Sequence, residues 1–270
     1  MLSGCSFSSP KLQGIQISLS DSKITVDGNE ITNDRSQAVY AANDIVFYLA
    51  GQDFTYGEGT AEDAHEQSEA DGHTVVHITK PGTYILSGAL SLGQIAVDLG
   101  EDAEDNPEAV VTIILNDVDI TCTVAPAIIF YNVYECGTDD EETATKDVDT
   151  SKAGANVIIA DGTENNINGS YVARIYKSVE LNEDGTEVVD SKKLHKYDAA
   201  FYSKKSMNVD GGEKGDGITN RHVLHKSFAI NYPAYVFIKN IVIFKGLFCV
   251  TSENHNSIFT IMSVSSRSNA

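Results

Sequence analysis

The stretch that decides the fold is GTYILSGALSLGQIAVDL at residues 82–99, followed by VTIILNDVDITCTVAPAIIFYNV at residues 111–133. In each half a short apolar run meets a polar corner, Ser87-Gly88 or Asn116-Asp117, and a second apolar run follows. β-Branched runs of this length, bounded by Gly, Asp and Asn, are typical of strands rather than helices. The sequence therefore predicts two successive strand–corner–strand units.

The unit recurs along the chain. Leu86 and Leu115 stand at equivalent points 29 residues apart. The phrase returns at residues 157–162 and, more faintly, at residues 207–211, with spacings of 44 and 50 residues. Short units that cannot bury an apolar face alone stack into solenoids. We therefore predict an all-β fold, a β-solenoid whose repeat carries inserted loops.

Turn residues predict two hairpins beside the repeat. Asp27-Gly28 separates apolar runs within residues 15–32, and Asp184-Gly185 lies between runs at residues 172–181 and 188–189. An Asp-Gly pair between two such runs is a strong hairpin signal. We expect the second hairpin to protrude from the solenoid, and we expect a further strand at residues 43–49.

Acidic residues dominate the charged composition and are unevenly placed. The formal net charge is -20, made of -24 in residues 1–217 and +4 in residues 218–270. Binding to a nucleic-acid backbone needs clustered Lys and Arg, so we expect no nucleic-acid partner. The change near Ile218 divides the chain into a start and tether at 1–14, a solenoid domain at 15–218 and an atypical tail at 219–270. The tail is either a terminal cap or a continuation foreign to the solenoid, such as frameshifted or grafted sequence.

The first residues have the form of a lipidation signal. Leu2-Ser3-Gly4-Cys5 matches a bacterial lipobox, in which Cys5 is the lipidated residue, and a polar, Ser-rich stretch follows. The basic and apolar regions of a secretory signal are missing upstream, which a late start codon or a trimmed sequence would explain. No apolar run approaches about 18 residues, the length of a membrane-spanning helix. We expect an extracellular protein, secreted or held at the cell surface as a lipoprotein, that touches a membrane only through its lipid.

Oxygen-bearing side chains gather at the predicted corners. Asp117 and Asp119 alternate along one strand, so they point the same way. Stacked coils bring such carboxylates to roughly 4.8 Å, where like charges need a cation or a proton between them, and hard oxygen ligands favour Ca²⁺. The alternative at each position is a side chain that caps its own turn. The predicted calcium ligands are Asp117, Asp119, Asp161, Glu164, Asn165, Glu213 and Asp216.

Aromatic and cationic residues flank the same corners and the protruding hairpin. Tyrosine rings can stack on sugar rings, although the chain has no Trp to form a conventional platform. The predicted carbohydrate-binding residues are Tyr131, Tyr134, Tyr176, Tyr202 and Lys204. Lyase chemistry would need a base, for which the candidates are Arg174, Lys177, Lys204 and Lys205, with ordinary solvated cations as the alternative. The seven histidines are expected at the surface.

The cysteines leave one question open. Cys122 and Cys136 flank one predicted strand and could sit on neighbouring coils within bridging distance. A disulfide and a pair of buried thiols both agree with this spacing.

Several phrases together carry a resemblance to a known family, at residues 82–88, 93–98, 111–120, 127–132, 161–165, 198–203 and 215–218. The chain resembles the bacterial secreted carbohydrate-binding domains whose β-helix is similar to that of pectate lyases, over residues 20–218 approximately. The resemblance implies a right-handed parallel β-helix that binds calcium and an acidic plant polysaccharide such as polygalacturonate. After Ile218 the corner phrases of the family stop, so ligands supplied by later coils are not expected from this tail.

These observations predict calcium-assisted binding of an acidic, pectin-like polysaccharide. A protein with a net charge of -20 repels a polyuronate, so calcium would bridge the carboxylates of protein and sugar. One alternative is a polysaccharide lyase that acts by β-elimination on uronic-acid polymers. Another is a surface adhesin or stalk that binds no sugar. The sequence favours a binding module over an enzyme.

Overall fold

Strands make up nearly all of the regular structure. The computed structural model describes residues 12–48, 50–56, 64–137, 142, 149–169, 175–186, 188–194 and 200–211, and the short strands β16 to β20 after them. The helical elements of this part are short: α1 (Gln67–Asp71), η1 (Glu101–Asp105) and η2 (Thr150–Lys152). None of the described helices is long and apolar enough to cross a membrane. The all-β prediction is confirmed.

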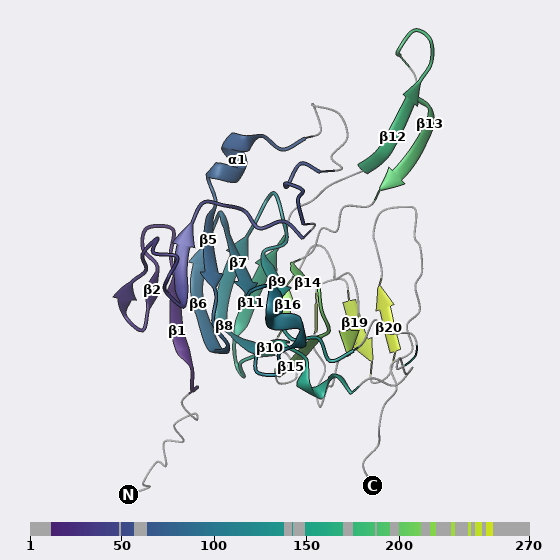
Figure 1. Ribbon diagram of the computed structural model, residues 1–270. Coiled ribbons are helices and arrows are strands. Elements are labelled where there is room, and N and C mark those ends of the chain that lie inside the picture. Colours follow the sequence, from purple (N-terminus) through teal and green to yellow (C-terminus); the bar gives the residue numbers. More distant parts are fainter. Residues whose placement is uncertain are drawn as a thin grey trace, which may run out of the picture.

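The larger sheet, sheet A, is built mainly from parallel neighbours (Figure 1). Its parallel strands, in spatial order, are β17 (Phe228–Ala229), β15 (Met207–Gly211), β10 (Ala155–Ile159), β8 (Val111–Thr121), β6 (Gly82–Leu90) and β1 (Ile15–Leu19). The predicted N-terminal hairpin adds β2 (Thr25–Val26) and β3 (Asn29–Glu30) antiparallel to β1. Strand β11 (Glu164–Asn168) pairs in parallel with the second half of β8 and with β16 (Gly217–Thr219).

The register of sheet A bears directly on the sequence repeat. Leu86 pairs with Leu115, and Leu115 pairs with Ile159, so the spacings of 29 and 44 residues are confirmed. The third spacing is wrong by two residues, because Ile159 pairs with Gly211 rather than with Val209. Strand β15 ends in a glycine where β8 and β10 have a branched or apolar residue. Matching apolar residues alone therefore aligns Val209, instead of Gly211, with Ile159.

The smaller sheet, sheet B, has the order β14 (Phe201–Ser203), β9 (Ile128–Asn132), β7 (Gly93–Asp98), β5 (Thr74–Ile78) and β4 (Val39–Ala42). All of its pairs are parallel except the pair of β4 with β5. From β5 to β9 the chain alternates between the sheets, because β6 and β8 belong to sheet A. Branched side chains from both sheets are fully buried in one core, among them Ile95, Ile113 and Ile128.

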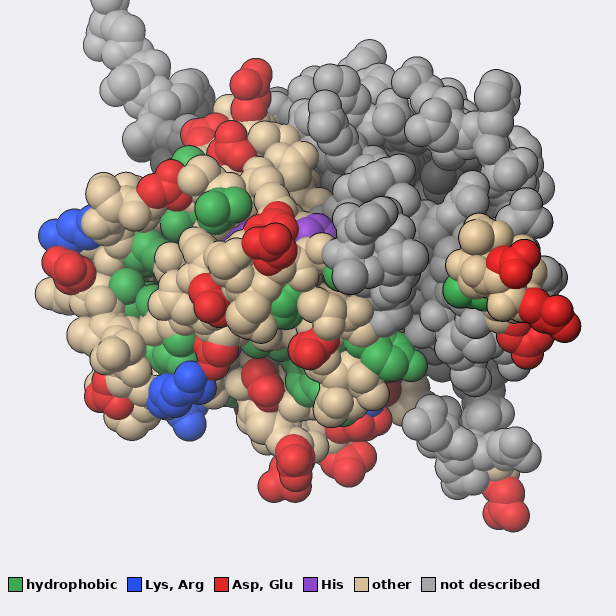
Figure 2. Space-filling view, turned by 90° about the horizontal axis from the view of Figure 1, so that it is seen from above, with side chains coloured by type: hydrophobic (Ala, Val, Ile, Leu, Met, Phe, Trp, Pro, Cys, Tyr) green, Lys and Arg blue, Asp and Glu red, His purple; other side chains and the backbone are tan. Residues whose placement is uncertain are grey.

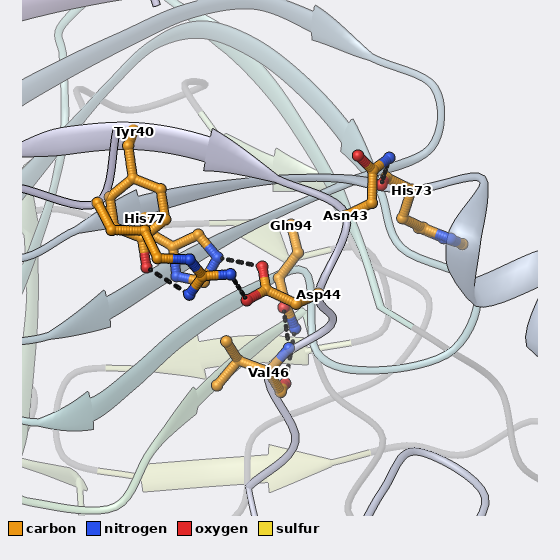
Figure 3. Close-up of polar contacts among 8 residues, drawn as sticks. Tyr40, Asn43, Asp44, Val46, His73, His77 and Gln94 are labelled. Carbon is orange, nitrogen blue, oxygen red and sulfur yellow. Dashed lines mark hydrogen bonds and ion pairs between the residues drawn. The ribbon is translucent and has the colours of Figure 1, made fainter. Parts of the chain in front are cut away.

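Residues 43–48, called the strap here, replace a predicted strand. The strap follows β4 and has no backbone pairing with another strand, so the prediction of a strand at 43–49 is wrong for its described residues. The Gln94 side chain takes the place of a pairing strand: its Oε1 accepts from Val46 N at 2.8 Å, and its Nε2 donates to Val46 O at 3.0 Å. The strap therefore lies on one face of sheet B, anchored by a buried amide (Figure 3).

The second predicted hairpin is present. Strands β12 (Ile175–Leu181) and β13 (Val188–Leu194) pair antiparallel around a turn in which Gly185 has a φ of 69°. Within the described part of the chain they pair only with each other, and Figure 1 shows them standing away from the sheets. In the tail, β18 (Phe237–Ile238), β19 (Ile241–Phe244) and β20 (Leu247–Val250) form a separate antiparallel sheet.

Candidate functional site

Polar side chains meet where three parallel strands of sheet B end. Val97 of β7 pairs with Phe130 of β9, and Phe130 pairs with Ser203 of β14, so the residues that follow are neighbours. The ladder shifts by one residue between Val97 and Asp98, which makes Tyr131 the extra residue of β9 at this point. We call this group the carboxyl-edge row; its members are Asp98, Tyr131, Asn132 and Lys204.

The row is held together by specific contacts. Asn132 Nδ2 donates to Asp98 Oδ1 at 2.8 Å, and the same oxygen accepts from Gly100 N at 3.0 Å. The Lys204 ammonium lies 4.9 Å from the centroid of the Tyr131 ring, within the range of a cation–π contact. Asp98, Tyr131 and Asn132 are half-buried and Lys204 is exposed. Burial, and then the charge of Asp98, raise the pKa of the Tyr131 hydroxyl, so the ring stays neutral.

This arrangement provides the groups that recognise a sugar. A sugar hydroxyl both donates and accepts, and the row offers a carboxylate that accepts beside an amide that donates. A tyrosine ring gives an apolar face with a polar tip, which suits the two-sided character of a sugar ring. A lysine ammonium adds a point charge with three donors. The row therefore has the chemistry of a glycan subsite.

A second polar cluster lies on the same sheet, where the strap crosses β5 (Figure 3). His77 Nε2 is 2.8 Å from Asp44 Oδ1, and the other oxygen of this carboxylate is 2.7 Å from the Arg35 guanidinium. The Tyr40 ring stacks on the His77 ring with centroids 4.5 Å apart and an interplanar angle of 7°. Tyr40 and His77 are register partners on β4 and β5, which places the two rings side by side.

The pKa shifts of this cluster follow from burial and charge. Burial lowers the pKa of His77 below its ordinary value, although the contact with Asp44 opposes that shift. Partial burial raises the pKa of Asp44, but the hydrogen bonds from Arg35 and His77 outweigh it, and the net shift is downward. At neutral pH the cluster therefore contains a neutral imidazole, a carboxylate and a guanidinium.

The predicted calcium ligands are only partly brought together. Asp117 Oδ1 accepts from Glu164 N at 3.0 Å, and Asp119 Oδ1 accepts from Asn166 Nδ2 at 3.1 Å, so both carboxylates bind β11. Asn165 points inward and is 2 % exposed, with its oxygen accepting from Val118 N. Asp161 and Glu164 are exposed, and Glu213 and Asp216 lie outside the described residues.

The hydrogen bonds of these corner residues join β8 to the segment of β11. Within the ranges that the structure describes, no three His, Cys, Asp or Glu side chains lie close enough together to hold a metal ion. The oxygens of Asp117 and Asn165 accept from backbone N–H groups of a neighbouring strand segment, Glu164 N and Val118 N, so these bonds join distant parts of the chain and do not cap their own turns. The described members of the set do not by themselves fit a calcium cage.

The predicted aromatic residues separate into three groups. Tyr131 and Lys204 are in contact and belong to the carboxyl-edge row. Tyr202 is a correction: it is 8 % exposed because the strap covers it, with the Tyr48 ring 5.0 Å away. Tyr134 is half-buried and its backbone bonds to Ala109 and Gly154, away from the row. The Tyr176 side chain and Cys5 lie outside the described residues, as do the side chains of Arg174 and Lys177.

Two further predictions concern cysteine and histidine. Cys122 and Cys136 form no disulfide with each other, so the open question is answered in favour of thiols. The expectation of surface histidines is wrong for His73 and His77, which are 0 % and 6 % exposed. Both lie on or beside β5 and are covered by α1 or the strap, which are contacts that the local sequence does not reveal.

Comparison with known families shows which family the chain belongs to. A family model described as "Carbohydrate-binding domain-containing protein" matches residues 71–217, more than half of the chain. The chain belongs to this carbohydrate-binding family. Searches of curated proteins and of solved structures found no match. The matched part of this carbohydrate-binding domain contains every member of the carboxyl-edge row, whereas the strap precedes it.

Sequence reasoning on this carbohydrate-binding domain found half of the row. The sequence predicts Tyr131 and Lys204 as carbohydrate-binding residues but does not predict Asp98 or Asn132. Each is the last residue of a strand in sheet B. That shared position, the first polar residue after a buried apolar run, is the signal that could have found them.

Proposed function

We propose that this protein binds an acidic polysaccharide at the carboxyl-edge row. The observation that carries the proposal is the Lys204 ammonium 4.9 Å from the Tyr131 ring, beside the Asp98–Asn132 pair. Membership of a carbohydrate-binding family supports a glycan as the ligand. The cation next to the ring supports an acidic glycan.

Each member of the row has a role in this proposal. The sugar ring packs on the face of Tyr131 and displaces the Lys204 ammonium, which then meets the sugar carboxylate. Asn132 donates to a sugar hydroxyl, and Asp98 accepts from one. Because Asp98 already holds Asn132 in place, the amide is positioned before the sugar arrives, and less conformational entropy is lost on binding.

The charge of the whole protein opposes a polyanion. The net charge is -20, and Figure 2 shows acidic side chains spread over one face with few basic ones among them. Lys204 supplies one local cation against this field. For the remaining repulsion we propose calcium, because an ion shared between protein and sugar carboxylates would offset it. Its full ligand set includes Glu213 and Asp216, which lie outside the described residues.

We also propose that the two sheets are faces of one right-handed parallel β-helix. Three observations support it: the parallel pairs within each sheet, the alternation of the chain between the sheets, and the repeat of 29 residues from Leu86 to Leu115. In that architecture the row runs across the coils, because β7, β9 and β14 belong to successive turns. A polymer would then lie across the strands. A lipid anchor on Cys5 would place the domain at the cell surface.

Calorimetry with polygalacturonate tests the proposal. The protein is titrated with polygalacturonate and with neutral dextran, each with calcium and then with chelator. The matched variants are Tyr131→Ala and Lys204→Gln in the row and Lys152→Gln, an exposed lysine of η2, as the control. We expect polygalacturonate to bind, dextran not to bind, and the two row variants alone to weaken binding. Retained affinity in both row variants would overturn the site.

The same experiment separates the alternatives. Loss of binding on chelation supports calcium bridging, and binding unaffected by chelator removes calcium from the proposal. Ultraviolet absorbance from an unsaturated product would show a lyase instead of a binding module. No binding to any glycan in either buffer would leave the adhesin or stalk.

A further inference from the structure

His73 and His77, the two buried histidines among the described residues, differ in how their ring nitrogens are used. His73 uses both: Nδ1 lies 2.8 Å from Glu69 O, and Nε2 accepts from Thr123 N at 3.1 Å. A carbonyl only accepts and an amide N–H only donates, so His73 carries its proton on Nδ1. This ring links α1 to the segment after β8 and has no nitrogen left for a ligand.

His77 uses only one nitrogen. Its Nε2 faces the Asp44 carboxylate, which only accepts, so the proton of the neutral ring lies on Nε2 and Nδ1 is an acceptor. No residue in the described part of the chain donates a hydrogen bond to Nδ1. Asn208 Oδ1 is the one fully buried side-chain nitrogen or oxygen without a partner among the described residues. Nδ1 of His77 therefore has no hydrogen-bond partner among the described residues and is not fully buried, although the residue is only 6 % exposed.

The surroundings of His77 fix the direction from which a ligand could reach it. Tyr40 covers one face of the ring, and Asp44 holds the Nε2 edge. His77 pairs with Ala96 on β7, and Asp98 lies two residues beyond Ala96 on the same face of the sheet. With neighbouring strands about 4.8 Å apart and two residues spanning about 6.6 Å of strand, such diagonal neighbours lie roughly 8 Å apart. The negative charge of Asp98 also acts on the imidazole. The imidazole of His77 thus lies on the same face of sheet B as Asp98 of the carboxyl-edge row.

We propose that Nδ1 of His77 accepts a hydrogen bond from a hydroxyl of the bound polysaccharide, which extends the glycan site from β9 and β14 to β5. This inference rests on the proposed function. Asp44 and Arg35 act as positioning residues: Arg35 holds the carboxylate at 2.7 Å, and the carboxylate keeps the imidazole proton on Nε2. The Tyr40 ring keeps the imidazole from rotating.

The proposal gives binding a pH dependence. Protonation turns Nδ1 from an acceptor into a donor and adds a positive charge, so in acid the proposed hydrogen bond from a sugar hydroxyl is lost and an attraction to the sugar carboxylates replaces it. The groups that face His77 are Asp44, Tyr40 and Arg35 from the β4 side and Asp98 from β7. Burial holds the pKa of His77 below the ordinary 6.5, so the acceptor is intact at neutral pH and is lost only in acid.

Nitrogen NMR of the histidine rings, with oligogalacturonate as the probe, tests this on the full chain. We expect the Nδ1 resonance of His77 to shift on titration while both ring resonances of His73 stay fixed. The variant His77→Gln keeps a donor near the Nε2 position for Asp44 and removes the Nδ1 acceptor. It should weaken binding about fivefold at neutral pH, the effect of one hydrogen bond, and should remove the change in affinity that the titration of His77 produces in mild acid.

The outcomes separate this inference from the proposed function. If the wild-type protein binds, Tyr131→Ala weakens binding, and His77→Gln binds like wild type with an unmoved Nδ1 resonance, the function stands and the role of His77 is overturned. If the wild-type protein binds no acidic glycan, the proposed function itself fails. Thermal unfolding of His77→Gln distinguishes a lost contact from a lost fold, and His77→Asn, which restores an acceptor near Nδ1, should regain affinity only if the contact is real.

Discussion

The Lys204 ammonium lies 4.9 Å from the centroid of the Tyr131 ring; Tyr131 lies on β9, and Lys204 directly follows the neighbouring parallel strand β14. A cation on a half-exposed ring is retained only weakly, because water competes for both groups. The contact is therefore easy to exchange for a ligand. An anionic sugar can stack its apolar face on the Tyr131 ring in place of the Lys204 ammonium. The ammonium can then pair with the negative charge of the same sugar.

Replacing Lys204 tests this exchange. Lys204→Gln removes the charge and keeps much of the side-chain length, so we expect affinity for polygalacturonate to fall about three- to fivefold, with a weaker dependence on salt. Lys152→Gln removes the same charge from η2 and should leave the affinity within error of wild type. An equal loss in both variants would show that net charge, and not the row, governs binding. Isothermal titration at two salt concentrations measures both effects.

The anchor of the strap predicts a large effect on stability. Gln94 is fully buried, and its amide serves Val46 N and Val46 O as well as Pro126 O at 2.8 Å. Gln94→Leu leaves these backbone groups without their partner, so we expect the free energy of unfolding to fall by about 3 kcal/mol. Hydrogen exchange at residues 43–48 should rise in parallel. Gln16→Leu, at an exposed position on β1, should change stability by less than about 0.5 kcal/mol.

Close backbone contact between the paired strands β10 and β15 predicts a steric effect at Gly211. Its φ is 93°, and an added Cβ would lie 2.3 Å from Ile159 O on the paired strand. Gly211→Ala should therefore destabilise the protein by about 2 kcal/mol or more, measured by urea unfolding. Gly162 has a similar φ of 76° but nothing within 4 Å of an added Cβ, so Gly162→Ala should cost only about 1 kcal/mol from backbone strain. Equal losses would mean that the contact with Ile159 relaxes freely.

The parts of the fold that sequence predicted are those coded locally. Branched runs fixed the strands and the pairing of Leu86 with Leu115, and the Asp27-Gly28 pair marked the first hairpin with φ values of 48° and 80°. These features depend on residue type and spacing over a few positions. The second hairpin, around Gly185, follows from the same turn chemistry.

The strap could not be predicted because its bonds join distant positions. Gln94 and Val46 are 48 residues apart, and neither residue shows locally that a side-chain amide will replace a strand. The burial of His77 has the same origin, since Asp44 and Tyr40 cover it from an earlier part of the chain. Half of the candidate site could not be predicted for a similar reason. Asp98 lies beside Asn132 only because β7 and β9 pair in register, which the local sequence does not show.

The Asp44–His77 pair predicts how stability depends on pH. The folded-state pKa of His77 lies below 6.5, so under mildly acidic conditions the unfolded chain binds more protons at this position than the folded one. Stability contributed by this group is therefore full above 6.5 and falls as the pH drops. Asp44 adds a second loss at lower pH, because its folded-state pKa lies below 3.8 and its contribution disappears as the carboxylate is protonated. Urea unfolding between about pH 7.5 and about pH 5.5 should show a loss of stability in the wild type and a flatter profile in His77→Gln. An unchanged slope in the variant would assign the loss to another group and leave His77 with its contact to Asp44 but no share in the acid response.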